Sequence, residues 1–193
     1  MRICIYGASS AELEKIFYTE AGDCGRLIAS RGHSLVFGGG KNGLMGAAAT
    51  GAHACGGEIV GIAPRFFDEP GILFESCTEF IYTDTMRERK KLMEEKSDAC
   101  LVLPGGIGTF EELFEMLTLK QLWQNERAIA LLNTDGYFDC LDTLLRSACE
   151  KGFVPESCLE LYRLCDTPAE ALDYIEGFVP RERGGKGIRD YNK

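Results

Sequence analysis

Short continuous runs of apolar residues recur along this chain, and each is followed by a glycine or polar turn and then by a segment with helical spacing. Such runs are typical of strands that are buried on both faces of a parallel sheet. They predict strands at Arg2–Tyr6, Ser34–Phe37, Glu58–Ala63, Glu79–Tyr82, Ala99–Leu103, Ala128–Leu132 and Leu161–Cys165. Helices are predicted at Leu13–Arg31, Leu44–Cys55, Thr85–Lys96, Phe110–Gln124, Tyr137–Lys151 and Pro168–Glu176. The alternation favours an α/β fold with a doubly wound, mostly parallel sheet of about seven strands flanked by helices.

The length and charge of the chain narrow its organisation and partners. A chain of 193 residues fits one domain, which we place at residues 1–179. Residues 180–193 are polar and glycine-rich, and they are expected to form a mobile tail. The net charge of −9 disfavours binding to nucleic acid or to an anionic membrane, but it is compatible with a local basic pocket for a phosphorylated small molecule.

The cysteines and histidines argue against disulfide and metal scaffolds. Nine cysteines are scattered without a C-x-x-C pair, and most lie in apolar runs where a thiol acts as a small hydrophobe. This usage favours the reducing cytoplasm. His33 and His53 have no partner at metal-ligand spacing, so we expect no metal, and no residue pattern requires an organic cofactor.

Two glycine-rich loops follow predicted strands, where a doubly wound sheet binds its ligands. Gly38–Gly46 formally contains G-x-G-x-x-G, and Gly39 and Gly40 allow a phosphate to approach the backbone. An acidic residue at the carboxyl end of the next strand, which a dinucleotide site needs, is missing. After the first strand, Ser9 offers a hydroxyl from a turn of small residues, although a plain tight turn explains that loop equally well.

The segment from Pro104 to Glu112 is the most specific feature of the sequence. It follows a buried strand and reads Pro-Gly-Gly-Ile-Gly-Thr-Phe-Glu-Glu. Thr109 is expected to cap the following helix and to present its hydroxyl to a phosphate. Glu112 has two interpretations at this stage: it closes a capping box with Thr109, or it meets sugar hydroxyls or a water at the ligand-binding edge.

A basic pair upstream also has two interpretations. Met86, Arg89, Lys90 and Met93 fall at helical spacing on one face, so at least one cation shares a face with apolar residues. Either the long basic side chains cover apolar surface with their charges in water, or Arg89 or Lys90 contacts an anion beside the glycine loop.

Together these segments resemble the Lonely Guy family of cytokinin riboside 5′-monophosphate phosphoribohydrolases, proteins often labelled lysine decarboxylases. The family pattern P-G-G-x-G-T-x-x-E matches Pro104–Glu112, and M-x-x-R-K matches Met86–Lys90. The likeness extends to the first two glycine loops and to Leu131–Tyr137. Pro64–Pro70 departs from the plant-like members, which leaves the preferred base open.

The resemblance implies a Rossmann-like homodimer that cleaves the N-glycosidic bond of N6-modified adenosine 5′-monophosphate, releasing free base and ribose 5-phosphate. It implies Arg89 and Glu112 as the catalytic pair. The remaining residues that we assign to the substrate site are Ser9, Gly39, Gly40, Met86, Lys90, Gly105, Gly106, Gly108, Thr109, Glu111 and Thr118. A broader nucleotide nucleosidase and a non-catalytic carrier of nucleotide or molybdenum cofactor are the alternatives. A pyridoxal-phosphate lysine decarboxylase would need a Schiff-base lysine, which no motif designates.

Overall fold

A computed structural model describes residues 1–180, so the predicted tail at 181–193 lies outside the described part of the chain. The sheet has seven parallel strands in the order β4-β3-β2-β1-β5-β6-β7. These strands are β1 Arg2–Tyr6, β2 Ser34–Phe37, β3 Ile59–Pro64, β4 Glu79–Thr83, β5 Ala99–Val102, β6 Ala128–Leu132 and β7 Arg163–Cys165. The predicted α/β fold is therefore confirmed, and all seven predicted strands lie within about two residues of their places.

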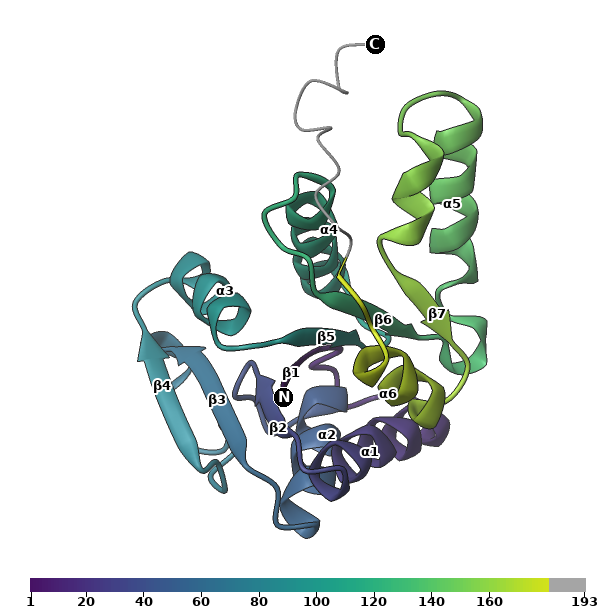
Figure 1. Cartoon of the computed structure of the whole chain (residues 1–193). Helices are drawn as coiled ribbons and strands as arrows, with labels where there is room; N and C mark the ends of the chain where they lie inside the picture. The colour runs from purple at the N-terminus through teal and green to yellow at the C-terminus, as the bar shows by residue number, and fades with distance from the viewer. Residues whose placement is uncertain (181–193) are drawn as a thin grey trace.

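Six α-helices cover the two faces of the sheet (Figure 1). They are α1 Lys15–Ser30, α2 Gly43–Ala54, α3 Met86–Glu95, α4 Ile107–Gln121, α5 Asp139–Glu150 and α6 Pro168–Glu176. Three short 3-10 helices complete the described elements: η1 Arg65–Phe67, η2 Thr134–Gly136 and η3 Glu156–Glu160. Helices α1, α2 and α6 pack against one face, and α3, α4 and α5 lie on the other.

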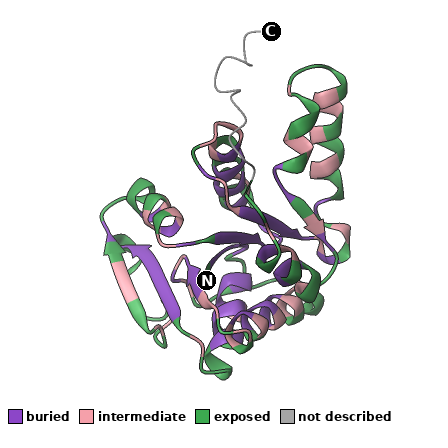
Figure 2. Cartoon of the chain, viewed as in Figure 1, coloured by how far each residue is buried: buried purple, intermediate pink, exposed green. Residues whose placement is uncertain are grey.

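The core is divided between these two faces because consecutive side chains of a strand point in opposite directions. In β1, Ile3 and Ile5 belong to the layer under α1 and α2, while Cys4 and Tyr6 belong to the layer under α4. Figure 2 shows the central strands buried and the outer strand β4 partly exposed. All nine cysteines are free thiols, and four of them are buried in these layers as the sequence predicts.

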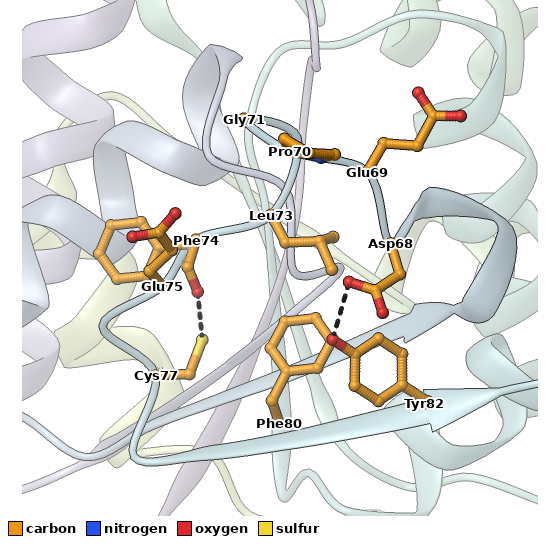
Figure 3. A pocket seen from close by; sticks show the side chains of 10 residues that line it. All are labelled: Asp68, Glu69, Pro70, Gly71, Leu73, Phe74, Glu75, Cys77, Phe80 and Tyr82. Atoms are coloured by element: carbon orange, nitrogen blue, oxygen red, sulfur yellow. Dashed lines mark hydrogen bonds between the residues drawn. The ribbon is translucent and has the colours of Figure 1, made fainter.

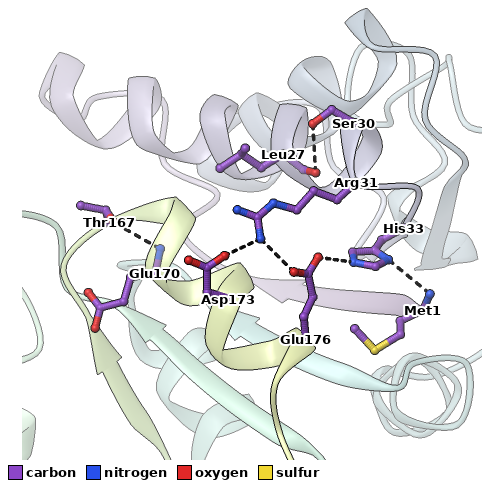
Figure 4. A network of polar contacts seen from close by, with 9 residues as sticks. All are labelled: Met1, Leu27, Ser30, Arg31, His33, Thr167, Glu170, Asp173 and Glu176. Atoms are coloured by element: carbon purple, nitrogen blue, oxygen red, sulfur yellow. Dashed lines mark hydrogen bonds and ion pairs between the residues drawn. The ribbon is translucent and has the colours of Figure 1, made fainter.

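Helix ends are set partly by local caps and partly by packing. Thr167 accepts a hydrogen bond from the amide of Glu170 at the start of α6, and Pro168 takes the first helical position. Helix α6 is also tied to α1, because Arg31 Nη1 lies 2.9 Å from Glu176 Oε2, and His33 Nε2 lies 2.8 Å from Oε1 of the same carboxylate (Figure 4). Within residues 1–180, no helix has the length and apolar character needed to span a membrane.

Candidate active site

The sheet changes its winding direction between β1 and β5, and the predicted loops meet there. β1 and β5 are adjacent, with Tyr6 paired in register with Val102. Beyond this pair, the Ala8 amide donates to the Pro104 carbonyl at 3.0 Å, and the Leu44 amide donates to the Ala8 carbonyl at 2.8 Å. The first loop, the start of α2 and the Pro104 loop are therefore joined at the switch point, where doubly wound folds bind ligands.

Arg89 and Glu112 form a buried ion pair at this edge. Arg89 extends from α3 and donates from Nη1 to Glu112 Oε1 at 2.8 Å, and it also donates from Nε to the Ile62 carbonyl at 3.3 Å. Less than one-tenth of either side chain is exposed. Arg89 is thus held inside the protein, which excludes the interpretation that its charge is solvated above an apolar surface.

Burial of Glu112 raises the pKa of its carboxyl above the ordinary value, although the positive charge of Arg89 opposes the rise. The groups on the sheet beside this carboxylate stay protonated. Burial raises the pKa of the Cys4 thiol to about 12, and burial also raises the pKa of the Tyr6 phenol. Of these three groups, Glu112 is therefore the strongest acid.

Gly38 provides the space for the Arg89 guanidinium. A Cβ atom at position 38 would lie 1.9 Å from Arg89 Nη2, so a larger residue there displaces the guanidinium. The glycine motif predicted roles for the neighbouring Gly39 and Gly40 but not for Gly38. Gly38 is the first of three consecutive glycines and directly follows β2, but its partner Arg89 lies on α3, far away in the sequence.

The capping box predicted for Thr109 and Glu112 is wrong. Helix α4 begins at Ile107 with Gly106 as its N-cap, and the Phe110 amide donates to the Gly106 carbonyl at 3.0 Å. Thr109 therefore lies within the first turn, and the helix starts three residues earlier than predicted. Because the helix starts at Ile107, Glu112 lies too far into it to close a capping box, and its carboxylate pairs with Arg89 instead.

The start of α4 is open on its outer side. A Cβ atom at Gly106 or at Gly108 would meet nothing within 4 Å, whereas one at Gly105 would lie 2.1 Å from Thr109 Oγ1. No side chain caps this end, and the first amides of an α-helix have no carbonyl partner one turn back. Packing against Thr109 thus explains why residue 105 is a glycine. The space beside Gly106 and Gly108 is open and leaves room for an anion.

Lys90 stands at the rim of the same site. Its ammonium forms ion pairs with Glu111 and with Glu115, the latter at 3.0 Å. Partial burial alone would lower the pKa of Lys90, but the two carboxylates raise it above the ordinary value. Lys90 and Glu111, predicted separately from two motifs, are therefore direct partners.

The structure brings only some of the remaining predicted site residues to this edge of the sheet. Ser9 is exposed in the loop after β1, and Met86 is 41% exposed at the first position of α3. Gly39 has φ of +75° and accepts at its carbonyl from the Phe74 amide at 2.8 Å, while a Cβ at Gly40 would meet nothing within 4 Å. Thr118 lies nine residues beyond Thr109 on α4, about 13 Å along the axis, and donates to the Phe114 carbonyl. The structure does not bring Thr118 to the other residues.

A hollow of about 500 Å³ lies beside this edge, between β4 and the segment that precedes it (Figure 3). Its lining residues are Asp68, Glu69, Pro70, Gly71, Leu73, Phe74, Glu75, Cys77, Phe80 and Tyr82. None of them was predicted as a site residue. Tyr82 donates to Asp68 at 3.1 Å across it. A Cβ at Gly39 would lie 2.8 Å from Phe80 Cζ, so the hollow adjoins the second glycine loop.

The fold and this site define an α/β protein with a buried arginine–glutamate pair beside an open glycine loop at the sheet's switch point. Residues 45–175 match the sequence model of the family described as "Possible lysine decarboxylase", and the chain belongs to that family. The chain is 39% identical over 173 residues to the cytokinin riboside 5′-monophosphate phosphoribohydrolase of Mycobacterium tuberculosis, covering 88% of this chain and 90% of the relative.

A plant relative and a solved structure extend the comparison. A cytokinin riboside 5′-monophosphate phosphoribohydrolase of Arabidopsis thaliana is 35% identical over 180 residues, covering 93% of this chain and 84% of the relative. The molybdenum cofactor carrier protein of Chlamydomonas reinhardtii has the same fold, with a TM-score of 0.70 at 22% identity, covering 91% of this chain and 95% of the carrier. The resemblance to the phosphoribohydrolases inferred from the motifs is therefore confirmed.

Proposed function

We propose that the chain hydrolyses the N-glycosidic bond of N6-modified adenosine 5′-monophosphate, releasing the free base and ribose 5-phosphate. The observation that carries this proposal is the buried pair of Arg89 and Glu112 beside the open start of α4. The names of the relatives support it, because enzymes that are 35% and 39% identical to this chain are called phosphoribohydrolases of a riboside 5′-monophosphate.

The residues of the pair have different roles in the proposed reaction. Glycosidic cleavage develops positive charge on the ribosyl carbon, and the Glu112 carboxylate stabilises that charge and orients the attacking water. The water oxygen bonds to the ribosyl carbon as the bond to the base breaks, and the base leaves with a proton. The Arg89 guanidinium holds Glu112 in place through its 2.8 Å hydrogen bond.

The nucleotide phosphate is proposed to lie at the start of α4, where Gly106, Gly108 and Thr109 offer backbone amides and a hydroxyl. Gly40 supplies close backbone approach, Gly39 shapes the loop that carries Gly40, and Gly105 lets the loop pack closely against Thr109. Lys90 and Glu111 are proposed to order the rim as an ion pair. Ser9, Met86 and Thr118 remain proposals from the resemblance alone, and Thr118 is remote from the pair within one protomer.

Lys90 does not fit the Schiff-base chemistry that a pyridoxal-phosphate lysine decarboxylase requires. A Schiff-base lysine reacts through its neutral amine. The ammonium of Lys90 is instead paired with Glu111 and Glu115, and these carboxylates raise its pKa. The lysine at the candidate site is therefore unsuited to that cofactor, and we derive no step through it.

We also propose that the protein is a cytoplasmic homodimer. Helix α5 has no buried residue in the single chain, and the exposed apolar residues Phe114 on α4 and Leu144 on α5 are available for contact with a second copy. Nine free thiols favour a reducing compartment. A measured solution mass of one chain would refute the dimer, and recovery in an oxidising compartment would refute the location.

The proposed activity is tested by incubating the pure protein with AMP and, separately, with N6-isopentenyl AMP, and by resolving free base and ribose 5-phosphate by chromatography. We expect release from the modified nucleotide, and we expect Glu112→Gln to lower kcat by about 100-fold or more. Glu150→Gln, at an exposed position on α5, is the matched control and should retain the wild-type rate.

The outcomes of this assay separate the competing functions. Equal rates on the two nucleotides would replace the proposal with a broader nucleosidase. Recovery of unaltered bound nucleotide, with no base released, would replace it with a carrier. A kcat of Glu112→Gln near that of the wild type would remove Glu112 from the mechanism.

A further inference from the structure

Tyr137 lies over the Pro104 loop, although it comes from a different part of the sheet. It directly follows η2, after strand β6, and the resemblance to the family assigns it no role. Its ring is parallel to that of Phe110 at 6.4 Å and perpendicular to that of Phe17 at 6.4 Å and to that of Phe138 at 5.1 Å. These three contacts fix the ring, so its hydroxyl has a defined position.

The Tyr137 hydroxyl donates a short hydrogen bond to the Gly105 carbonyl. The peptide that joins Gly105 to Gly106 is planar and trans, as all described peptides are, so its N–H points opposite to its C=O. The Gly106 N–H is therefore directed away from Tyr137. The same constraint holds one residue earlier, where the Pro104 carbonyl accepts from the Ala8 amide at 3.0 Å.

Two successive carbonyls of the Pro104 loop thus accept hydrogen bonds from within the protein. The first accepts from the Ala8 amide in the loop after β1, and the second accepts from the Tyr137 hydroxyl. The outer side of Gly106 is open, since a Cβ there would meet nothing within 4 Å. Gly106 is also the N-cap of α4, where the positive end of the helix dipole favours an anion. A free glycine peptide rotates easily, and the hydrogen bond from Tyr137 removes that freedom.

We propose that Tyr137 is a positioning residue that fixes the Gly105–Gly106 peptide with its N–H facing the 5′-phosphate of the substrate. This rests on the proposed function, because it assumes that the start of α4 binds the phosphate. Tyr137 acts through the backbone and does not touch the reacting atoms. The phosphate is present in both the substrate and the transition state, so the hydrogen bond contributes to binding and not to the chemical step.

The test is Tyr137→Phe, which keeps the ring and its packing and removes only the hydroxyl. We expect KM for the nucleotide to rise about threefold to tenfold, the worth of one hydrogen bond, while kcat stays within about twofold. The inhibition constant of ribose 5-phosphate should rise by the same factor. The phosphate-free nucleoside should be hydrolysed with an unchanged kcat/KM.

Tyr162→Phe is the matched control, because the Tyr162 hydroxyl also donates a hydrogen bond, to Asp142 Oδ1 on α5 at 2.7 Å, and Tyr162 lies outside the proposed site. It should leave KM for the nucleotide unchanged. An unchanged KM in Tyr137→Phe, or an equal rise for nucleotide and nucleoside, would overturn the proposal. A fall in kcat with KM unchanged would also overturn it.

Direct binding separates this proposal from the proposed function. Ribose 5-phosphate is titrated calorimetrically into the wild type and into Tyr137→Phe. If the wild type releases no base but binds ribose 5-phosphate more tightly than the variant, the proposed reaction fails and the role of Tyr137 stands. If the two proteins bind it equally, the role of Tyr137 fails whatever the wild type catalyses.

Discussion

Arg89 Nη1 and Glu112 Oε1 lie 2.8 Å apart in an ion pair that is almost completely removed from solvent. Bringing two charges out of water costs about as much free energy as their attraction returns, so such a pair contributes little net stability. A buried pair at the ligand-binding edge of a sheet is better explained by chemistry, and it concentrates charge where a ribosyl cation would form.

As the pH is lowered, the rate of base release should begin to fall at a pH above the ordinary pKa of glutamic acid. Glu112 acts as a carboxylate, and burial raises its pKa, so it takes up a proton earlier on acidification than a free side chain does. The measurement is kcat from pH 4 to pH 8, with circular dichroism confirming the fold at each pH. A folded enzyme with a flat profile down to pH 4.5 would contradict the assignment.

Gly38→Ala should lower kcat by about 100-fold, because the new methyl group takes the place of the Arg89 guanidinium. The guanidinium is the mobile end of a long side chain, so the protein should still fold, with about 1–3 kcal/mol less stability from the weakened hydrogen bonds of the pair. The measurements are kcat and the urea midpoint.

Gly22→Ala is the control for this substitution. Gly22 lies inside α1, and a Cβ there makes ordinary contacts of 3.5 Å or more. The control should keep full activity. A Gly38→Ala enzyme as active as the control would show that the position of Arg89 is unimportant.

Gly108→Ala should make the protein more stable and bind nucleotide more weakly. Alanine favours the helix over glycine by up to about 1 kcal/mol, and a Cβ at position 108 meets no protein atom within 4 Å. The Tm should therefore rise by about 2 °C. The methyl group would occupy space proposed for the phosphate, so KM should rise by about tenfold. A higher Tm with an unchanged KM would place the phosphate elsewhere.

Glu176→Gln should loosen α6 from α1. The hydrogen bond from His33, and then those of Arg31, lower the pKa of Glu176 below the ordinary value. The folded state thus binds a proton at Glu176 less readily than the unfolded state does. The stabilisation is present at neutral pH, and it is lost as the pH falls through the ordinary pKa of the carboxyl and then through its lowered pKa in the folded state. The network is drawn in Figure 4.

The expected cost at pH 7 is about 1 kcal/mol, or about 2 °C in Tm, because the pairs are partly exposed. At pH 3 the wild type and Glu176→Gln should melt at nearly the same temperature. A difference in Tm that persists undiminished at pH 3 would argue that the charge of Glu176 is not what stabilises the helix. Thermal melts at both pH values measure this.

The apolar runs of the sequence determined the strands, and local signals determined several helix ends. The apolar run that begins at Ala99 ends before Pro104, because proline cannot continue a central strand, and the Thr167 cap depends only on a residue three positions away. The motifs also selected Arg89 and Glu112, whose proposed catalytic role rests on residue types and spacing that match a family. Such information lies within a few neighbouring positions or in a fixed pattern.

Tertiary structure decided the contacts between distant segments. Helix α4 begins at Ile107, so Thr109 is not its N-cap and the capping box with Glu112 does not form; the Glu112 carboxylate pairs with Arg89 from α3 instead. The need for glycine at position 38 depends on the Arg89 side chain from α3. The position of the Tyr137 hydroxyl depends on the Gly105 carbonyl, 32 residues earlier. A single sequence carries no signal for these partners, because each contact exists only after the sheet has brought the ends of separate strands to one edge.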